Sequence, residues 1–233
     1  MIVVVANRWD QSARTFAERW KSYDVRVLTA QDLSSAGWRQ GLNAEDAHTA
    51  VVDGIAAPQD QITGTLTRLF GVGEEELPDI AAGDREYVAA EMTAFLWFWL
   101  SSLSCPVLSR PTPACLTGPH WRRESWVRAA AQAGIPVETV HRGAGFRLRW
   151  TLARQEELRS SSPTVTVVGD QTIGEADRLL HRQARVLARF AGVELLAVRF
   201  SSPDRDACFV SANVFPDLTD DRVSAAILEH LER

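Results

Sequence analysis

Apolar residues in the first third of the chain form short runs that alternate with one amphipathic segment. Residues 2–7 begin with an unbroken apolar run, which is typical of a strand buried on both faces of a parallel sheet. Residues 11–21 place their apolar side chains at helical spacing. Apolar runs at 25–28 and 50–52 predict a second and a third strand. This order, with short connections, predicts a doubly wound α/β layer.

The next hydrophobic segments predict one ambiguous element and one long helix. Residues 59–70 fit a helix, but the threonines at 63, 65 and 67 also fit the alternation of a strand. We expect Asp84 to cap a helix that runs to Leu103 and carries aromatic residues on nearly all sides. Such a helix is deeply buried or lies at an interface. It therefore predicts a homodimer or a stable complex with another subunit.

The rest of the chain holds strand and helix patterns on either side of a polar segment. Residues 143–163 are basic, then highly charged, then rich in serine, which is typical of a linker. We therefore expect one domain at 1–142 and a second region at 164–233. The remaining expected elements are strands at 105–108, 135–140, 164–168, 193–200 and 208–212 and helices at 122–134, 177–191 and 220–231.

The charge, the apolar runs and the cysteines of the sequence argue against several classes of protein. The net charge of −5 gives no reason to expect nucleic-acid binding, because 30 acidic residues offset the basic ones. The longest apolar run, around 95–100, is too short to span a bilayer, and no basic segment precedes the first strand as in a signal peptide. The three cysteines lack metal-ligand spacing and cannot all pair, which favours reduced thiols in a cytoplasmic protein.

Lys21 is the single lysine among 25 basic residues. P-loop proteins, protein kinases and Schiff-base enzymes each need a lysine at a defined place in the site. Lys21 ends the first predicted helix, which suits none of these roles. The arginines stay protonated and cannot act as nucleophiles, but their guanidinium groups can bind carboxylates and phosphates with two parallel hydrogen bonds. The sequence therefore argues against those three classes of enzyme.

Four stretches of the chain carry a family resemblance through their common order. They are 84–91 followed by 106–111, then 129–137, then 165–170, and finally 196–200 with 209–218. In this order they resemble the ATP-grasp superfamily, and most closely its RimK-like branch of graspetide-type peptide maturases. The resemblance implies an α/β fold in which a pre-ATP-grasp-like parallel layer precedes a shortened ATP-grasp-like α+β half. It also implies ancestry among ligases that join a carboxylate to an amine with ATP and Mg²⁺.

The positions that would hold Mg²⁺ depart from this family. The resemblance implies an Asp at the end of one C-terminal strand and a Glu and an Asn on the next, and these positions are Arg199, Ser211 and Asn213 here. Mg²⁺ requires hard oxygen ligands, and a guanidinium repels it. The lysines that reach the nucleotide have no counterpart, and the segment between 140 and 165 is too short for the usual nucleotide lid. We therefore expect no cofactor, with ATP and Mg as the alternative.

Arginines at loops and element ends are the main binding candidates. In the ligases this side of the cleft receives the carboxylate substrate or peptide, and arginine forks suit a carboxylate, a phosphate or an acidic peptide. Ordinary surface ion pairs are the alternative, and Glu91 either orients a substrate or pairs with an arginine. The candidate substrate- or partner-binding residues are Arg68, Glu91, Arg110, Arg122, Arg123, Arg142 and Asn213.

No catalytic or metal-ligating residue is assigned. His120, Trp121 and Trp126 either form a wall of a site or, for Trp126 especially, belong to the core. The sequence shows no Ser/His/Asp order and no zinc signature. We therefore expect a non-catalytic ATP-grasp-like accessory or binding protein in peptide or natural-product maturation, which binds a peptide, an anionic small molecule or a partner enzyme. The alternatives are an active peptide ligase with a rebuilt nucleotide site and an unrelated binding module.

Overall fold

The computed structural model describes residues 1–41, 47–137 and 162–233. The chain forms two compact units, unit 1 from Met1–His120 with Asp217–Arg233 and unit 2 from Trp121–Pro216. This division differs from the predicted domains at 1–142 and 164–233. The boundary lies before the helix near 123, and the last seventeen residues return to unit 1. Nearly all of the predicted linker lies outside the described residues.

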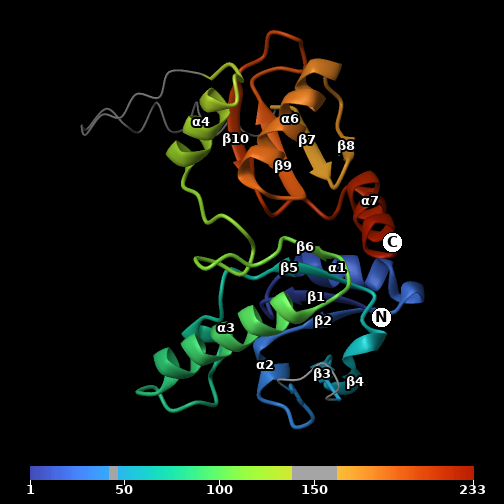
Figure 1. Ribbon diagram of the computed structural model, residues 1–233, viewed down its shortest axis with the longest axis vertical. Helices are drawn as coiled ribbons and strands as arrows, with labels where there is room; N and C mark the ends of the chain where they lie inside the picture. Colours follow the sequence, from blue (N-terminus) through green and yellow to red (C-terminus); the bar gives the residue numbers. More distant parts are fainter. Residues whose placement is uncertain (42–46, 138–161) are drawn as a thin grey trace. The chain divides into compact units, whose positions relative to one another are not determined.

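Unit 1 is built on a parallel sheet with the strand order β2-β1-β5-β6 (Figure 1). β1 (Ile2–Ala6) is buried at every position and lies between β2 (Val25–Leu28) and β5 (Gly64–Arg68). β6 (Val107–Leu108) pairs with β5. The first two predicted strands are confirmed, and the ambiguous segment at 59–70 contains a strand. The predicted α/β layer is therefore present, with β5 as its third strand.

The apolar run at 50–52 belongs to a hairpin and not to this sheet. β3 (Thr49–Val52) pairs antiparallel with β4 (Ile55–Pro58) as a separate two-stranded sheet. The two residues between the strands, Asp53 and Gly54, both have positive φ angles, 52° and 71°. Positive φ at both central positions is the geometry of a type I′ hairpin turn. The prediction of a third parallel strand here was wrong because this turn reverses the chain at once.

The helix α3 (Arg85–Ser102) covers one face of the parallel sheet (Figure 1). Its Leu96, Trp99 and Leu100 are buried in one cluster with alternate residues of β1. On its outer side Tyr87, Trp97 and Phe98 remain 69%, 42% and 41% exposed. The helix is therefore buried along one face only, and its aromatic outer face is left open in this chain. The shorter helices of this part are α1 (Gln11–Arg19) and α2 (Ala30–Leu33).

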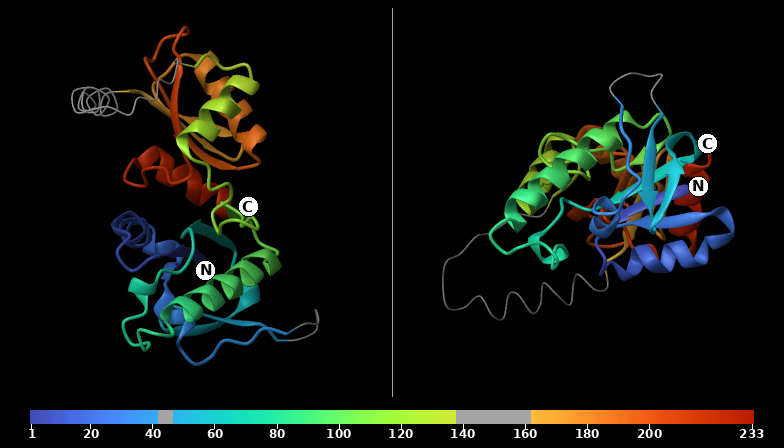
Figure 2. Two further views of the ribbon diagram at one scale, coloured as in Figure 1. Left: turned by 90° about the vertical axis from the view of Figure 1, so that its left-hand side faces the viewer. Right: turned by 90° about the horizontal axis from the view of Figure 1, so that it is seen from below.

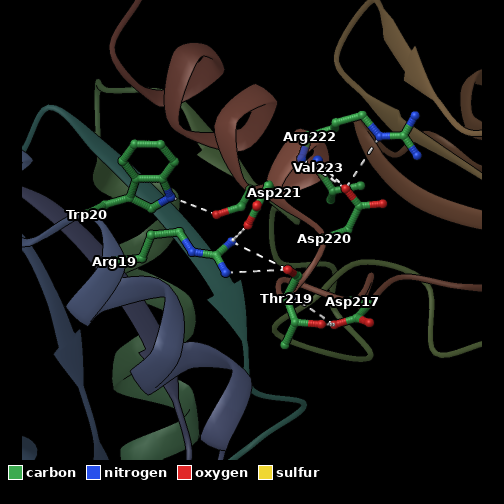
Figure 3. A network of polar contacts seen from close by, with 9 residues as sticks. Arg19, Trp20, Asp217, Thr219, Asp220, Asp221, Arg222 and Val223 are labelled. Carbon is green, nitrogen blue, oxygen red and sulfur yellow. Dashed lines mark hydrogen bonds and ion pairs between the residues drawn. The ribbon is translucent and has the colours of Figure 1, made fainter.

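The last helix, α7 (Asp221–Leu231), packs against unit 1. Asp220 caps it by accepting hydrogen bonds from two backbone N–H groups at its start. Arg19 at the end of α1 forms an ion pair with Asp221 at 2.8 Å, and the Trp20 indole donates to the Ser224 hydroxyl at 2.7 Å (Figure 3). These contacts tie the C-terminal helix to the first helix of the chain.

In its described residues, unit 2 is an antiparallel sheet with the helices α4 and α6 on one face (Figure 2). The strand order is β10-β9-β7-β8, and the helices α4 and α6 bury the apolar side of these strands. The predicted strand at 135–140 is described only to Val137, which forms an isolated bridge to Phe209. The elements are α4 (Arg123–Gln132), β7 (Thr164–Val168), β8 (Gln171–Ile173), α6 (Arg178–Ala191), β9 (Leu195–Phe200) and β10 (Phe209–Asn213).

Candidate functional site

The open face of the unit 2 sheet carries the positions where the family resemblance implies metal ligands. Arg199 on β9 lies directly opposite Ser211 on β10, and Asn213 follows two residues later on the same face. The intervening Val198 and Phe200 point to the other face, where they are fully buried under α4 and α6. The strands therefore bring these three positions together in the expected arrangement, although two of the three expected side chains are absent.

These side chains do not fit a magnesium ion. Arg199 is half-buried and brings a positive charge, and it has no acidic partner within the described ranges. Ser211 is neutral, and the Asn213 side-chain oxygen accepts a hydrogen bond from the Phe215 N–H at 3.0 Å. Across the described residues, no group of three or more His, Cys, Asp or Glu side chains could hold a metal ion. Mg²⁺ bound to nucleotide phosphates is normally held by carboxylates, so this face lacks the required donors.

A second polar region lies at the carboxyl edge of the unit 1 sheet. Arg68 ends β5 with its side chain only 8% exposed, and its Nε donates to the Asp10 carboxylate at 2.8 Å. Asp10 in turn caps α1 by accepting from the Ala13 N–H. Thr219 donates two hydrogen bonds to Asp217 and so lowers the pKa of that carboxyl, and the charge of Arg68 adds to the effect. Arg68 is therefore used in a nearly buried ion pair, whereas the alternative to ligand binding had been an ordinary surface ion pair.

Arg110 lies at the same edge of the sheet but, unlike Arg68, has an exposed side chain. It is exposed and follows Ser109, a buried residue with φ of 63° and no hydrogen-bond partner for its hydroxyl among the described residues. A left-handed conformation is uncommon for a non-glycine residue and turns the chain sharply out of β6. Two backbone hydrogen bonds between Thr112 and Cys115 then close a turn. Ligands of open parallel sheets bind beyond the carboxyl ends of the strands, so Arg110 keeps its place as a binding candidate.

The other candidates are dispersed. Arg122 and Arg123 stand at the start of α4 in unit 2, so the arginine set divides between the two units. Glu91 is exposed on α3, and the predicted pairing with an arginine is not found in the part of the chain that the structure describes. Trp126 is buried in the unit 2 core, as its helical spacing predicted. Arg142 lies outside the described residues.

Three residues of these regions were missed by the sequence analysis. Asp10 could have been recognised as a helix cap, because an Asp directly precedes the helical pattern at 11–21. Its partner Arg68 is distant in the chain, and no local signal links the two. Ser109 and Asp217 have no sequence signal that distinguishes them from ordinary loop residues.

The sequence matches no protein-family model and no curated protein sequence. Several solved structures do match it over almost its whole length. The macrocyclase MdnC from Microcystis aeruginosa MRC, bound with precursor peptide MdnA, aligns with a TM-score of 0.71 and 12% identity over 100% of both chains. The macrocyclase MdnB from the same organism aligns with a TM-score of 0.60 and 14% identity, over 100% of this chain and 99% of that one. A RiPP-associated ATP-grasp ligase from Chryseobacterium gregarium, in complex with ADP and a leader and core peptide, aligns with a TM-score of 0.63 and 11% identity. This alignment covers 99% of this chain and 96% of that one.

This chain has the ATP-grasp fold. The predicted fold class and the resemblance to peptide-maturing ATP-grasp ligases are therefore confirmed at the level of the fold. At identities of 11–14% the likeness does not extend to substrates or activity. None of the described helices is both long and apolar enough to cross a membrane. All three cysteines are free.

Proposed function

We propose that this ATP-grasp chain is a non-catalytic binding protein in the maturation of a peptide natural product. The observation that carries the proposal is the pairing of Arg199 with Ser211 on β9 and β10. At these positions the family resemblance implies an Asp and a Glu that hold Mg²⁺. A guanidinium beside a neutral hydroxyl gives the ion no anionic ligand and adds an opposing charge.

The retained fold supports a role in binding. The core strands and helices of both units are well packed, so the substitutions at the metal positions have not been accompanied by loss of the scaffold. MdnC is bound with a precursor peptide in its structure, and the Chryseobacterium ligase holds a leader and core peptide. By analogy, we propose that this chain binds a peptide, an anionic small molecule or a partner enzyme. A cytoplasmic location and self-association remain predictions from the sequence.

Thermal unfolding with and without nucleotide tests the proposal. We expect millimolar Mg-ATP to leave the melting temperature unchanged, because only a ligand that binds the native state raises it. A rise of more than about 3 °C that EDTA abolishes would contradict the proposal. That result would favour an active ligase with a rebuilt nucleotide site, in which arginines replace the usual lysines.

A double variant tests the physical reason for the loss. Arg199→Asp together with Ser211→Glu places two carboxylates opposite each other on the open face. We expect this variant to bind Mn²⁺, followed by its paramagnetic effect on water relaxation, more tightly than the unmodified chain. Equal Mn²⁺ binding by the two proteins would show that Arg199 is not what excludes the metal.

A further inference from the structure

A groove of about 740 Å³ runs along the outer side of α3 in unit 1. One side of the groove is a stripe of the helix at spacings of three and four residues. Ala89, Ala90, Thr93 and Ala94 form its floor, and Glu86 and Trp97 lie at the two ends of the stripe. The opposite wall comes from Phe70 and the residues that follow it up to Glu74, and from the turn at 112–116. Small side chains on the helix and large aromatic ones at its borders leave a space that a peptide side chain can enter.

Hydrogen bonds hold the walls of this groove in place. The Thr93 hydroxyl accepts from the Val72 N–H at 2.9 Å and donates to the Ala89 carbonyl at 2.8 Å. The Trp97 indole donates to the Thr112 carbonyl at 3.1 Å, which joins the helix to the second wall. A groove whose borders are fixed in advance loses little conformational entropy when a ligand binds.

The charged residues that line the groove are acidic, which favours a ligand with positive charge. Among the residues that the structure describes, the charged residues lining the groove are Glu74 and Glu86, both exposed, and Glu75 lies next to Glu74 in the chain. Arg85 donates to the carbonyls of Ile80 and Pro78, so its guanidinium is directed at the backbone. No arginine or lysine in the described chain lines this space. The groove therefore joins an apolar floor and aromatic borders to a negative rim.

We infer that this groove docks a peptide segment in which apolar side chains stand next to arginine or lysine. The apolar side chains would cover the alanines and the exposed faces of Phe70 and Trp97, and the basic ones would pair with Glu74 and Glu86. A second copy of this chain fits less well, because α3 packed on its own image would bring two negative rims together. The inference rests on the proposed function for the choice of a peptide as ligand.

Fluorescence polarisation with a designed peptide tests the inference. The probe is a fluorescein-labelled heptapeptide of alternating leucine and arginine, measured with the full chain in the absence of nucleotide. Controls replace its arginines by glutamates or its leucines by serines. We expect the leucine–arginine peptide to bind at least about tenfold more tightly than either control, since each control removes one of the two complementary features.

Matched variants locate the site. Glu74→Lys and Glu86→Lys change exposed lining residues and should each weaken binding of the probe by about fivefold or more. Glu75→Lys makes the same charge change at an exposed neighbour that does not line the groove, and it should have a clearly smaller effect. Ala90→Trp fills the groove from an exposed helix position and should abolish binding.

Three results would overturn the inference. They are equal affinity for the probe and its glutamate control, equal effects of the Glu74 and Glu75 variants, and a stable dimer in light scattering that Ala90→Trp dissociates. The last result would assign the groove to a second copy of the chain. Because no nucleotide is present, a negative result here leaves the Mg-ATP test of the proposed function unaffected.

Discussion

Substitution of Gly64 by alanine tests how the C-terminal helix is attached to unit 1. Gly64 begins β5, and a Cβ atom built there would lie 2.5 Å from the Leu231 carbonyl oxygen and 2.7 Å from the Leu231 Cβ. Both neighbours belong to the end of α7, so relief of the clash requires that helix to move. Overpacking of this kind costs about 1–3 kcal/mol. With a urea dependence of about 2 kcal/mol/M, the unfolding midpoint should fall by about 0.5–1.5 M.

Urea denaturation followed by circular dichroism measures this effect, and Gly83→Ala is the matched control. A Cβ at Gly83 meets no atom within 4 Å, and its φ is not in the left-handed region. We expect Gly83→Ala to unfold at the same urea concentration as the unmodified chain. If Gly64→Ala were as stable as Gly83→Ala, α7 would not be packed against β5, and the assignment of the last helix to unit 1 would be wrong.

Two further predictions concern single polar residues. Arg110→Glu should weaken the binding of inorganic pyrophosphate, measured by calorimetry, by at least about tenfold, or about 1.4 kcal/mol. Its circular dichroism spectrum should not change. An unchanged affinity would show that Arg110 is an ordinary surface charge. Burial raises the pKa of the Cys105 thiol, so the unfolded chain ionises first and stability should fall as the pH rises above the ordinary value for cysteine. Cys105→Ser should remove this part of the pH dependence in urea titrations at pH 8 to 10, and an identical slope in both proteins would contradict it.

Local signals explain why much of the fold was predictable. The strand β1 is an uninterrupted apolar run, and it is buried at all of its positions. The helix α6 has a clear amphipathic pattern behind Asp177, whose carboxylate accepts from the Leu179 N–H. In both cases the side chains that stabilise the element are its own or adjoin it in sequence. Such elements are specified by the local sequence, and their predicted positions are confirmed.

The errors arose where a decisive contact is remote or where a local signal was misjudged. The Asp53–Gly54 pair is a strong hairpin signal, but the run before it was assigned to the parallel sheet because that completed a strand–helix–strand unit. The amphipathic pattern of α7 predicts a helix without indicating which apolar surface it covers. Its packing on unit 1 depends on Gly64, about 160 residues away in a separate element, which no periodicity can reveal.

The same distinction applies to the functional residues. The family resemblance drew attention to Arg199 and Ser211, and the alternation of β9 and β10 is consistent with both lying on one face. The ion pair between Asp10 and Arg68 could not be anticipated, because it joins the cap of α1 to the last residue of β5, 58 residues away in sequence. The strand pattern therefore placed Arg199 and Ser211 side by side, whereas it gave no indication of the ion pair between Asp10 and Arg68.

The two faces of β9 differ in how strictly the fold constrains their side chains. Leu196, Val198 and Phe200 are completely buried under α4 and α6, so a polar substitution at any of them would remove core packing. Arg199 and Ser211 lie on the face that these helices leave open, where a change from carboxylate to guanidinium disturbs no packed side chain. If carboxylates have been replaced at these positions, as we propose, the replacement would cost little stability. Overall likeness of fold gives no information on activity, so the proposed absence of magnesium binding is argued from the charge at position 199 and needs the Mg-ATP test.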